Sequence, residues 1–146
     1  KVKDYVRGTV TTSEAKDAEK LLGEFQKSDH PVGTPKVFLD TPTPTGFRTI
    51  IQNFKAPNGH IGEIQFTTHE MLDAKKKIGD GMYNQLRSLY AKAKAEGRMD
   101  LTAKEIKQEK KLVDKMTAIY DRAYAAGNRR LASSKETTSP SLSADA

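Results

Sequence analysis

Cysteine and tryptophan are both absent from this sequence of 146 residues. Without cysteine the chain can form neither disulfide bonds nor thiolate metal sites, and the cellular compartment stays open. Long apolar runs are also missing, so neither a membrane span nor a secretory hydrophobic segment is predicted, and we expect no membrane partner. The length fits one domain, which can bury about two-thirds of the surface of its unfolded chain.

Acidic residues are too few to balance the basic ones. The chain has 19 Asp and Glu against 25 Lys and Arg, which gives a formal net charge of +6 and a pI near 9.4. A basic chain favours anionic partners such as nucleotides or RNA. The densest basic run, Lys107-Gln108-Glu109-Lys110-Lys111, is more typical of a solvated helix face than of an RNA contact.

Residues 42–71 form the most informative stretch, which reads PTPTGFRTIIQNFKAPNGHIGEIQFTTHEM. Two strand-like runs, 47–55 and 60–67, are joined by Ala56-Pro57-Asn58-Gly59, and Asn-Gly between such runs predicts a β-hairpin. The segment before the hairpin alternates threonine and proline, as a stiff linker or a shaped loop at the rim of a site would. Because it joins two strands and leads into Gly46-Phe47-Arg48, we favour the loop.

The second strand of this hairpin alternates in polarity. Ile64 and Phe66 point to one side and are predicted core residues. Glu63 and Gln65 share the other side, about 7 Å apart at the usual rise of a strand. Half-exposed antiparallel sheets commonly carry such a polar face toward solvent. The pair is thus either a solvated strand face or part of a site.

Asp4 poses the same choice on the predicted first strand, residues 2–10. Alternation puts its carboxylate beside the side chains of three valines, where an unpaired charge is costly to bury. Either Asp4 pairs with Arg7, Arg48 or a lysine, or it binds a cation. Two carboxylates from separate strands, here Asp4 and Glu63, are a common way to build a magnesium site for phosphoryl transfer.

In this order and spacing the residues resemble the RelA/SpoT-type nucleotidyltransferase domain of (p)ppGpp synthetases. That family carries PKPNGY followed by R or Q and then S, a hairpin, and E-V/I-Q-I-R-T with a methionine three residues on. Here PTPTGFRT spans 42–49, EIQFTTHEM spans 63–71, and KDYVRGTV at 3–10 resembles the strand whose aspartate holds magnesium. The resemblance covers roughly residues 2–90. It implies an α/β (α+β) fold with a mixed sheet of about four to five strands flanked by helices.

The resemblance also implies an enzyme that moves pyrophosphate from ATP to a ribose hydroxyl of a purine nucleotide or RNA, with Mg²⁺ as cofactor. Asp4 and Glu63 would hold the metal, and Glu63 would help to deprotonate the attacking hydroxyl. Gln65 would orient the acceptor or a metal-bound water. These three are the predicted catalytic residues.

Three substrate contacts follow from the same resemblance. Arg48 and Arg7 would neutralise phosphate oxygens, for which the guanidinium fork is suited. Phe47 takes the position of the family's tyrosine, which stacks on the acceptor base, and a phenyl ring keeps that ability.

Several positions depart from the family pattern. The lysine and asparagine of PKPNGY are Thr43 and Thr45, the arginine after E-x-Q-I is Thr67, and an expected histidine is Ile51. Contacts to the acceptor phosphates are therefore lost while the candidate metal residues stay. We expect an acceptor other than GDP, either an adenosine nucleotide or an RNA 3′ end, as in toxin-type members. A toxin implies an immunity or antitoxin protein as partner and a cytoplasmic site of action, and it leaves secretion as an effector open.

The chain begins at Lys1, directly before the aspartate strand. Relatives carry basic residues and a serine that bind ATP ahead of that strand, so we expect a C-terminal portion completed by an upstream domain or a partner chain. Two other functions stay open. One is a catalytically degenerate module of the same fold that binds or regulates, and the other is a basic RNA-binding domain that uses its lysine-rich helices.

The remaining elements follow from periodicity and capping signals, which predict helices near 13–28, 70–96 and 103–127 and a strand near 36–40. Capping boxes are expected at Thr11–Glu14 and Thr102–Glu105, and Thr68 is expected to cap the middle helix. Gly79-Asp80-Gly81 predicts a break or hinge, because two glycines cost about 2 kcal/mol in a helix interior. Asp29–Gly33 is predicted to be a loop.

Beyond that hinge, the apolar stripe is expected to resume with Tyr83, Leu86, Leu89 and Tyr90, and Lys and Arg are expected on the other face. Residues 97–127 would complete a C-terminal helical hairpin, at the end of a catalytic portion that spans 1–127. Residues 128–146 are rich in Ser, Thr and Ala and are predicted to be a disordered tail.

Overall fold

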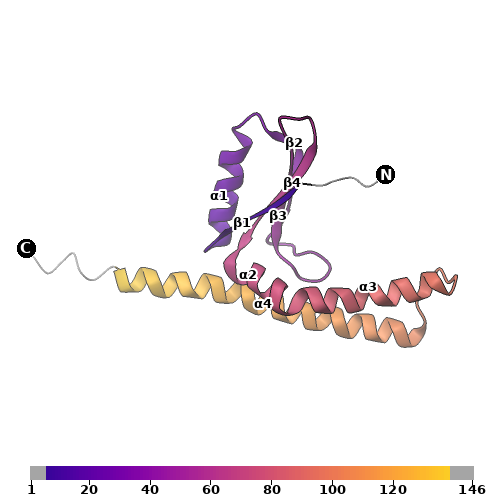
Figure 1. Ribbon diagram of the computed structural model, residues 1–146. Helices are drawn as coiled ribbons and strands as arrows, with labels where there is room; N and C mark the ends of the chain where they lie inside the picture. The colour runs from indigo at the N-terminus through magenta and orange to yellow at the C-terminus, as the bar shows by residue number, and fades with distance from the viewer. Residues whose placement is uncertain (1–5, 139–146) are drawn as a thin grey trace, which may run out of the picture.

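The computed structural model of the protein describes the backbone of residues 6–138 and the side chains of residues 6–127. In chain order the elements are β1 (Arg7–Thr12), α1 (Ala15–Gln26), β2 (Pro31–Phe38), β3 (Thr49–Lys55), β4 (Ile61–Thr68), α2 (His69–Ala74), the π-helical turn η1 (Lys75–Gly79), α3 (Asp80–Ala95) and α4 (Ala103–Thr138). Figure 1 shows a sheet with α1 on one face, standing on a long hairpin of α3 and α4 that lies across its base.

The four strands form one mixed sheet in the order β1-β4-β3-β2. β1 pairs with β4 in parallel, and the other two pairings are antiparallel. β3 and β4 form the predicted hairpin, where Gly59 has φ +83°, a conformation that favours glycine. The predicted mixed sheet with flanking helices and a C-terminal helical hairpin is confirmed.

Alternation along the central strands separates a core face from an uncovered face. Ile50 of β3 and Phe66 of β4 are buried and pack against Ala18 and Leu22 of α1. Ile64 is half-buried against the same cluster, so the predicted inward direction of Ile64 and Phe66 is confirmed. The residues between them point to the other face of the sheet, which α1 does not cover.

Two glycines let α4 approach the rest of the molecule closely. At Gly46, where φ is +91°, an added Cβ would lie 2.7 Å from Thr117 Cα. At Gly79 an added Cβ would overlap Tyr120 Oη. The contact closes a second core, whose buried members are Met71, Met116 and Tyr120.

The middle helix does not break at Gly79-Asp80-Gly81, so the predicted hinge is wrong. The chain runs as one continuous helix from α2 through η1 into α3. The wider π-helical turn places Gly79 against Tyr120, where a larger residue would clash. This packing outweighs the low helix propensity of glycine, which is roughly 1 kcal/mol per residue.

Two predicted helix caps are confirmed and one is wrong. Thr68 Oγ1 accepts a hydrogen bond from Met71 N at 3.3 Å, and Thr102 Oγ1 accepts one from Glu105 N at 3.2 Å. The capping box at Thr11–Glu14 does not form, because α1 begins after Glu14 and Glu14 makes no side-chain cap.

Some boundaries differ from the sequence expectation. β2 begins at Pro31, inside the stretch predicted as a loop, and its pairing with β3 shifts register between Val32 and Lys36. α4 continues to Thr138, so its predicted end at 127 is wrong; residues 139–146 lie outside the described residues. In the described part of the chain no helix, α4 included, combines the length and apolar character needed to cross a membrane.

The apolar stripe predicted on α3 is only partly correct. Leu86 is buried and Leu89 half-buried, as expected of residues that face a partner helix. Tyr83 and Tyr90 are 46% and 50% exposed, so their assignment to the stripe is wrong. Tyr83 lines a hollow beside the loop at residues 43–47, and the hydroxyl of Tyr90 bonds Glu109 of α4.

Candidate active site

Glu63 and Gln65 lie side by side on the uncovered face of β4. Gln65 Nε2 donates a hydrogen bond to Glu63 Oε1 at 2.9 Å, and both side chains are half-buried. Glu63 is the only acidic residue in the four described strands. The structure therefore brings two of the predicted catalytic residues together and isolates one carboxylate on this face.

β1 supplies a cation beside that carboxylate. In the parallel register Arg7 is the partner of Glu63, and Thr9 is the partner of Gln65. Register partners on neighbouring strands point to the same face, so the exposed Arg7 stands on the face that carries Glu63. A predicted phosphate contact thus adjoins the predicted base.

Asp4, the predicted partner of Glu63 in a metal site, lies outside the described residues. Among residues 6–127 no group of three or more His, Cys, Asp or Glu side chains could hold a metal ion. A site with Glu63 as its one described ligand would need a second ligand from Asp4 or from a substrate. The metal pair stays a prediction.

A hollow of about 780 Å³ opens between the loop at residues 43–47 and the side of η1 and α3. Its lining combines aromatic, cationic and amide groups, among them Phe47, Tyr83, Tyr120, Lys75, Arg87 and Asn84. Phe47 is half-buried and meets Tyr120 edge to face, with 5.3 Å between ring centroids. A hollow of this size with aromatic walls is suited to a nucleotide.

The loop at the rim of this hollow has a defined shape. Thr43 N donates to Phe47 O at 3.0 Å, and Gly46 N donates to Thr43 O at 2.8 Å. The sequence expectation of a shaped loop, in preference to a linker, is confirmed. The threonines that replace the family's lysine and asparagine, Thr43 and Thr45, both line the hollow.

Charge within the hollow is mostly positive or neutralised. Lys75 Nζ lies 3.1 Å from Asp80 Oδ1, which pairs the one acid of the lining with a cation. Arg87 has no ion pair among the described side chains. Burial, and secondarily the charge of Asp80, raises the pKa of Tyr120 to about 12, so its hydroxyl is neutral at physiological pH.

Thr49, the first residue of β3, follows the loop beside the hollow and contacts the uncovered sheet face. Thr49 Oγ1 lies 3.5 Å from Gln65 Oε1, and the loop with Phe47 ends immediately before Thr49. Thr67 Oγ1 donates to Arg48 O at 2.7 Å, which fixes the same junction. Thr49 thus links the end of the loop to Gln65 on the sheet face.

Arg48 has a different environment from the one expected of a phosphate ligand. Its Nη1 donates to Leu39 O, its Nη2 lies 3.5 Å from Asp121 Oδ1, and its guanidinium stands 4.5 Å from the centre of the Tyr124 ring. Its Nε is buried and has no hydrogen-bond partner in the described part of the chain. Arg48 thus links the loop to α4 through Asp121 and Tyr124. Its contact with phosphate stays a prediction.

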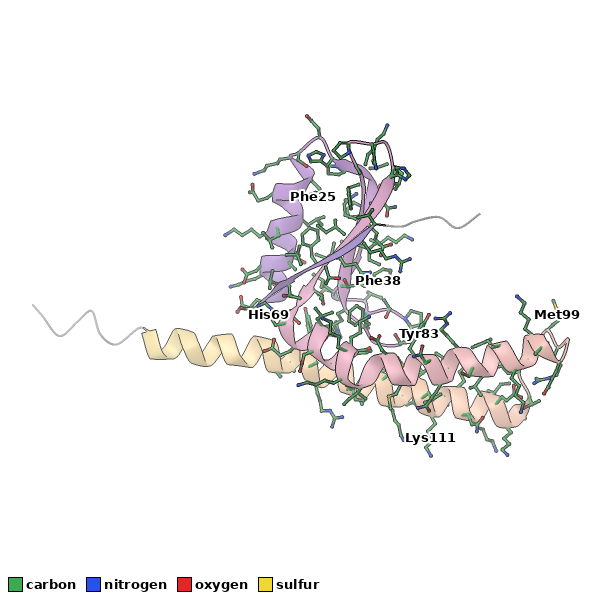
Figure 2. The ribbon with its side chains drawn as sticks, in the orientation of Figure 1. Phe25, Phe38, His69, Tyr83, Met99 and Lys111 are labelled. Atoms are coloured by element: carbon green, nitrogen blue, oxygen red, sulfur yellow. The ribbon has the colours of Figure 1, made fainter. Side chains whose placement is uncertain are left out.

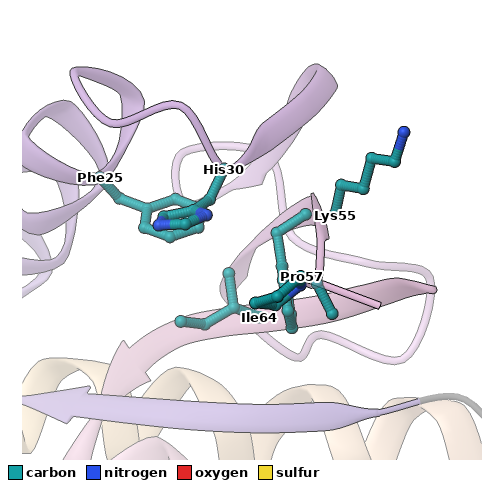
Figure 3. A pocket seen from close by; sticks show the side chains of 7 residues that line it. Phe25, His30, Lys55, Pro57 and Ile64 are labelled. Carbon is teal, nitrogen blue, oxygen red and sulfur yellow. The ribbon is translucent and has the colours of Figure 1, made fainter. Parts of the chain in front are cut away.

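A second hollow, of about 290 Å³, lies between the end of α1 and the β3–β4 hairpin (Figure 3). Its walls are mainly apolar and include Phe25, Phe54 and Ile64, with His30 and Lys55 at the edge. Ile64 alternates with Glu63 along β4, so this hollow is on the α1 side of the sheet. It does not belong to the candidate site.

Sequence reasoning missed the residues that α3 and α4 bring to the nucleotide-sized hollow. Tyr83, Arg87 and Tyr120 come from helices that were interpreted only as packing elements. The spacing of four residues between Tyr83 and Arg87 was a usable signal, since such residues share one helix face. Tyr120 gave no local signal, because its position depends on contacts between segments far apart in the sequence.

Comparison with known proteins identifies the fold. No protein-family model matches the chain, and no curated protein matches its sequence. Small alarmone synthetase 2 of Bacillus subtilis matches with a TM-score of 0.55 and 19% identity over 88% of this chain and 65% of that one. Small alarmone synthetase 1 of Bacillus subtilis, bound to its product pppGpp, matches with a TM-score of 0.54 and 13% identity over 89% and 61%. The type VI effector Tas1, in complex with its immunity protein, matches with a TM-score of 0.51 and 21% identity over 84% and 68%.

These matches define the class: the chain has the RelA/SpoT-like fold of small alarmone synthetases, as the motifs at 42–49 and 63–71 implied. It spans 65% and 61% of the length of the two Bacillus subtilis synthetases. Identities between 13% and 21% show the fold alone, because one fold can serve many activities.

Proposed function

We propose that the protein transfers pyrophosphate from ATP to a ribose hydroxyl. The hydroxyl oxygen forms a bond to the β-phosphorus of ATP, and the bond from that phosphorus to the oxygen bridging the α- and β-phosphates breaks. AMP leaves with the bonding pair, the hydroxyl proton passes to Glu63, and the acceptor carries the pyrophosphate. In such transfers the protein mainly positions the reactants and offsets charge on the phosphates.

The observation that carries this proposal is the setting of Glu63. It is the single acid of the described strands, it is half-buried, and it is oriented by Gln65 and adjoined by Arg7. A sheet face in contact with solvent needs no such arrangement. A carboxylate fixed by an amide beside a cation suits proton abstraction next to an anionic phosphate.

Mg²⁺ fits the donor chemistry of this face. Magnesium in phosphoryl-transfer sites commonly takes one or two carboxylates and completes its shell with water and substrate phosphates. Glu63 would hold the ion together with Asp4, and Arg7 and Arg48 would contact the phosphates. When bound, Mg²⁺ would offset the charge that develops on the transferred group.

The proposed acceptor is a purine nucleotide or an RNA end whose base enters the hollow beside Phe47. The ring of Phe47 is half-buried, so its exposed part can stack on a base. Thr43 and Thr45 present hydroxyls where the family carries a lysine and an asparagine. Fewer contacts to acceptor phosphates support an adenosine nucleotide or an RNA 3′ end over GDP.

The biological role is proposed from the structural similarity to Tas1. Tas1 was solved with an immunity protein, which supports a toxin or effector role with an immunity partner for this chain as well. ATP as donor supports the cytoplasm as the site of action.

A catalytically degenerate binding module is the second candidate, and one observation favours it. Arg48 already bonds Leu39 O and Asp121 and stacks on Tyr124, so a predicted phosphate ligand acts as a structural residue. Such a module would bind nucleotides in the hollow without turning over ATP.

AMP formation separates the two candidates. The complete natural polypeptide is incubated with ATP, Mg²⁺ and either adenosine nucleotides or RNA, and AMP is quantified by chromatography. We expect AMP only when Mg²⁺ and an acceptor are both present. Nucleotide binding with no AMP under any of these conditions would replace the transferase by the binding module.

A further inference from the structure

Three consecutive residues at the end of the loop before β3 each contact one face of α4. The contacted residues occupy positions i, i+3, i+4 and i+7 of the helix, which lie in one stripe. The loop residues are Gly46, Phe47 and Arg48, and the stripe consists of Thr117, Tyr120, Asp121 and Tyr124. Figure 2 shows Phe38, with which β2 ends, at the base of the sheet nearest the helical hairpin. The chain that follows it therefore meets the hairpin, where α4 sets the position of Arg48.

The guanidinium of Arg48 is not among the described groups that line the hollow, although Phe47 directly before it lines the hollow. Arg48 Nη1 instead donates to Leu39 O, and Nη2 lies 3.5 Å from Asp121 Oδ1. The guanidinium also stands 4.5 Å from the centre of the Tyr124 ring. A side chain assigned to phosphate is thus held beside the hollow and outside it.

These contacts satisfy Arg48 only in part. Its Nε is buried and has no hydrogen-bond partner among the described residues, and an unpaired buried donor costs free energy. The 3.5 Å to Asp121 exceeds the roughly 2.7–2.9 Å of a strong charge-assisted hydrogen bond. The Asp121 side chain is 53% exposed, so solvent weakens the pair further. The position on α4 is therefore one that Arg48 can leave at small cost.

The surroundings of this position repel anions. Burial raises the pKa of the Tyr124 hydroxyl, and the charge of Arg48 opposes this shift. The charges of Asp40 and Glu19 raise the same pKa, so both carboxylates act at the ring on which Arg48 stacks. A phosphate group would meet their negative charge here, together with that of Asp121. Pairing between phosphate and Arg48 is therefore disfavoured while Arg48 stays on α4.

We propose that this contact is autoinhibitory: α4 holds Arg48 away from the phosphates, and Arg48 must leave α4 before it can bind them. We call Asp121 and Tyr124 the Arg48 latch. Release exchanges a long, solvent-weakened ion pair for a bidentate arginine–phosphate contact, which is among the strongest that a side chain makes. Only the molecules with Arg48 released bind phosphate at full strength, so the latch lowers the apparent affinity. The inference rests on the proposed function, since that function assigns the phosphate contact to Arg48.

A purely structural contact and a latch predict opposite effects of the same substitution. If Arg48 only links the loop to α4, removal of its partner loosens the site, and phosphate affinity falls or stays unchanged. If the contact is a latch, the same removal raises the affinity. Asp121→Asn keeps the size of the side chain and removes the charge that holds Arg48, so it separates the two.

The test uses inorganic pyrophosphate as the probe, so that it depends on neither ATP nor catalysis. Calorimetry follows its binding in about 0.15 M salt, where charges more than roughly 8 Å apart are largely screened. Asp121→Asn should raise pyrophosphate affinity about twofold to fivefold, as the loss of a partly exposed ion pair allows. Adenosine, which carries no phosphate, should bind the parent and the variant equally. In the Arg48→Gln background, Asp121→Asn should give no gain.

Asp114 provides a matched control on the same helix. It is exposed and lies two turns before Asp121, about 10 Å along the axis and on the same side of α4. Asp114→Asn removes the same charge and should leave pyrophosphate affinity unchanged. An equal gain in Asp114→Asn would show general electrostatic attraction by a basic protein and would overturn the latch.

The side chain of Arg48 supplies a second, direct readout. Its Nε–H group gives a resonance of its own in ¹⁵N NMR, and Arg48→Gln assigns that resonance by its loss. Pyrophosphate should shift the resonance in the parent, because the buried Nε leaves α4. A resonance that does not move while pyrophosphate binds would show that Arg48 remains on α4. Thermal melting of Asp121→Asn should stay close to that of the parent, since the lost ion pair is partly exposed.

The outcomes separate this inference from the proposed function. Pyrophosphate affinity that falls or stays the same in Asp121→Asn would overturn the latch, and so would pyrophosphate that binds neither protein. If the affinity rises and the resonance shifts but no AMP forms from ATP, the latch stands and the transferase fails. If AMP forms and Asp121→Asn changes nothing, the transferase stands and the latch fails.

Discussion

At the scale of single residues, the account depends on Glu63 and on the two groups beside it. Gln65 holds one carboxylate oxygen at 2.9 Å, and Arg7 stands opposite on β1. Nothing in the described contacts makes Glu63 necessary for folding, because its hydrogen bond lies outside both cores. A role in chemistry and a role in stability can therefore be measured separately.

Glu63→Gln keeps the volume of the side chain and removes its charge. We expect the rate of AMP formation to fall at least about a hundredfold, the lower end for losing a general base. Thermal melting should change little or rise, because the amide can keep the bond with Gln65. Glu24→Gln, an exposed carboxylate on α1, should leave the rate unchanged. Full activity in Glu63→Gln would remove Glu63 from the mechanism.

Phe47 has two roles that one substitution can separate. Its ring packs against Tyr120 and its exposed part borders the hollow. Phe47→Leu keeps an apolar side chain but cannot stack, so AMP affinity should fall about fivefold or more, while Phe47→Tyr should be tolerated. Phe54→Leu alters an aromatic on the second hollow and should lower stability without changing AMP affinity. Equal AMP affinity in Phe47→Leu would contradict the stacking role.

Tyr120 predicts a particular dependence of stability on pH. Burial, with Asp80 as a second cause, raises the pKa of Tyr120 to about 12, whereas a tyrosine in the unfolded chain ionises near pH 10. Above about pH 10 the unfolded chain therefore binds fewer protons than the folded one, and stability falls as pH rises toward 12. Below pH 10 this contribution is fully present. Urea unfolding between about pH 9 and 11 should show a shallower decline for Tyr120→Phe than for the parent.

At the scale of elements, η1 is the feature that couples the two halves of the molecule. The π-helical turn places Gly79 under Tyr120 of α4, while Lys75 of the same turn lines the hollow. π-helical turns often occur at functional sites, where they change the direction in which side chains point. The position of η1 at the wall of the hollow agrees with that tendency.

The two glycines near η1 should respond to alanine in opposite ways. Gly79→Ala forces a methyl group onto Tyr120 Oη and should cost about 1–3 kcal/mol, as overpacking does. Gly81→Ala meets nothing within 4 Å and should stabilise α3 by roughly 0.5–1 kcal/mol. Urea midpoints measure both.

A rescue variant tests the cause of the Gly79 effect. Because the closest atom is the hydroxyl oxygen of Tyr120, Gly79→Ala/Tyr120→Phe should recover part of the lost stability. A double variant no more stable than Gly79→Ala would show that the backbone of η1, and not the contact with α4, is responsible.

At the scale of the whole molecule, local patterns predicted the elements and part of the site. Alternation in β4 was sufficient to separate Ile64 and Phe66 from Glu63 and Gln65, because strand periodicity needs no distant information. Turn and cap signals located the hairpin and two helix starts for the same reason.

Contacts between distant segments could not be predicted in this way. The sequence offered no sign that Arg48 would pair with Asp121 and stack on Tyr124, more than seventy positions away. Its contact with phosphate was inferred from the family resemblance and stays a prediction. The fit of Gly79 against Tyr120 likewise turned a predicted hinge into a continuous helix. Tyr83 and Tyr90 were assigned to the core because periodicity does not tell which side of a hairpin is covered.

ATP labelled at either end tests the central claim most directly. The complete polypeptide is given [γ-³²P]ATP or [α-³²P]ATP with Mg²⁺ and the acceptor, and the labelled products are separated. Pyrophosphate transfer predicts that the γ label moves to the acceptor while the α label stays in AMP, in equal amounts. An α label on the acceptor would show nucleotidyl transfer instead, and a γ label found only in free phosphate would show hydrolysis; either result contradicts the account.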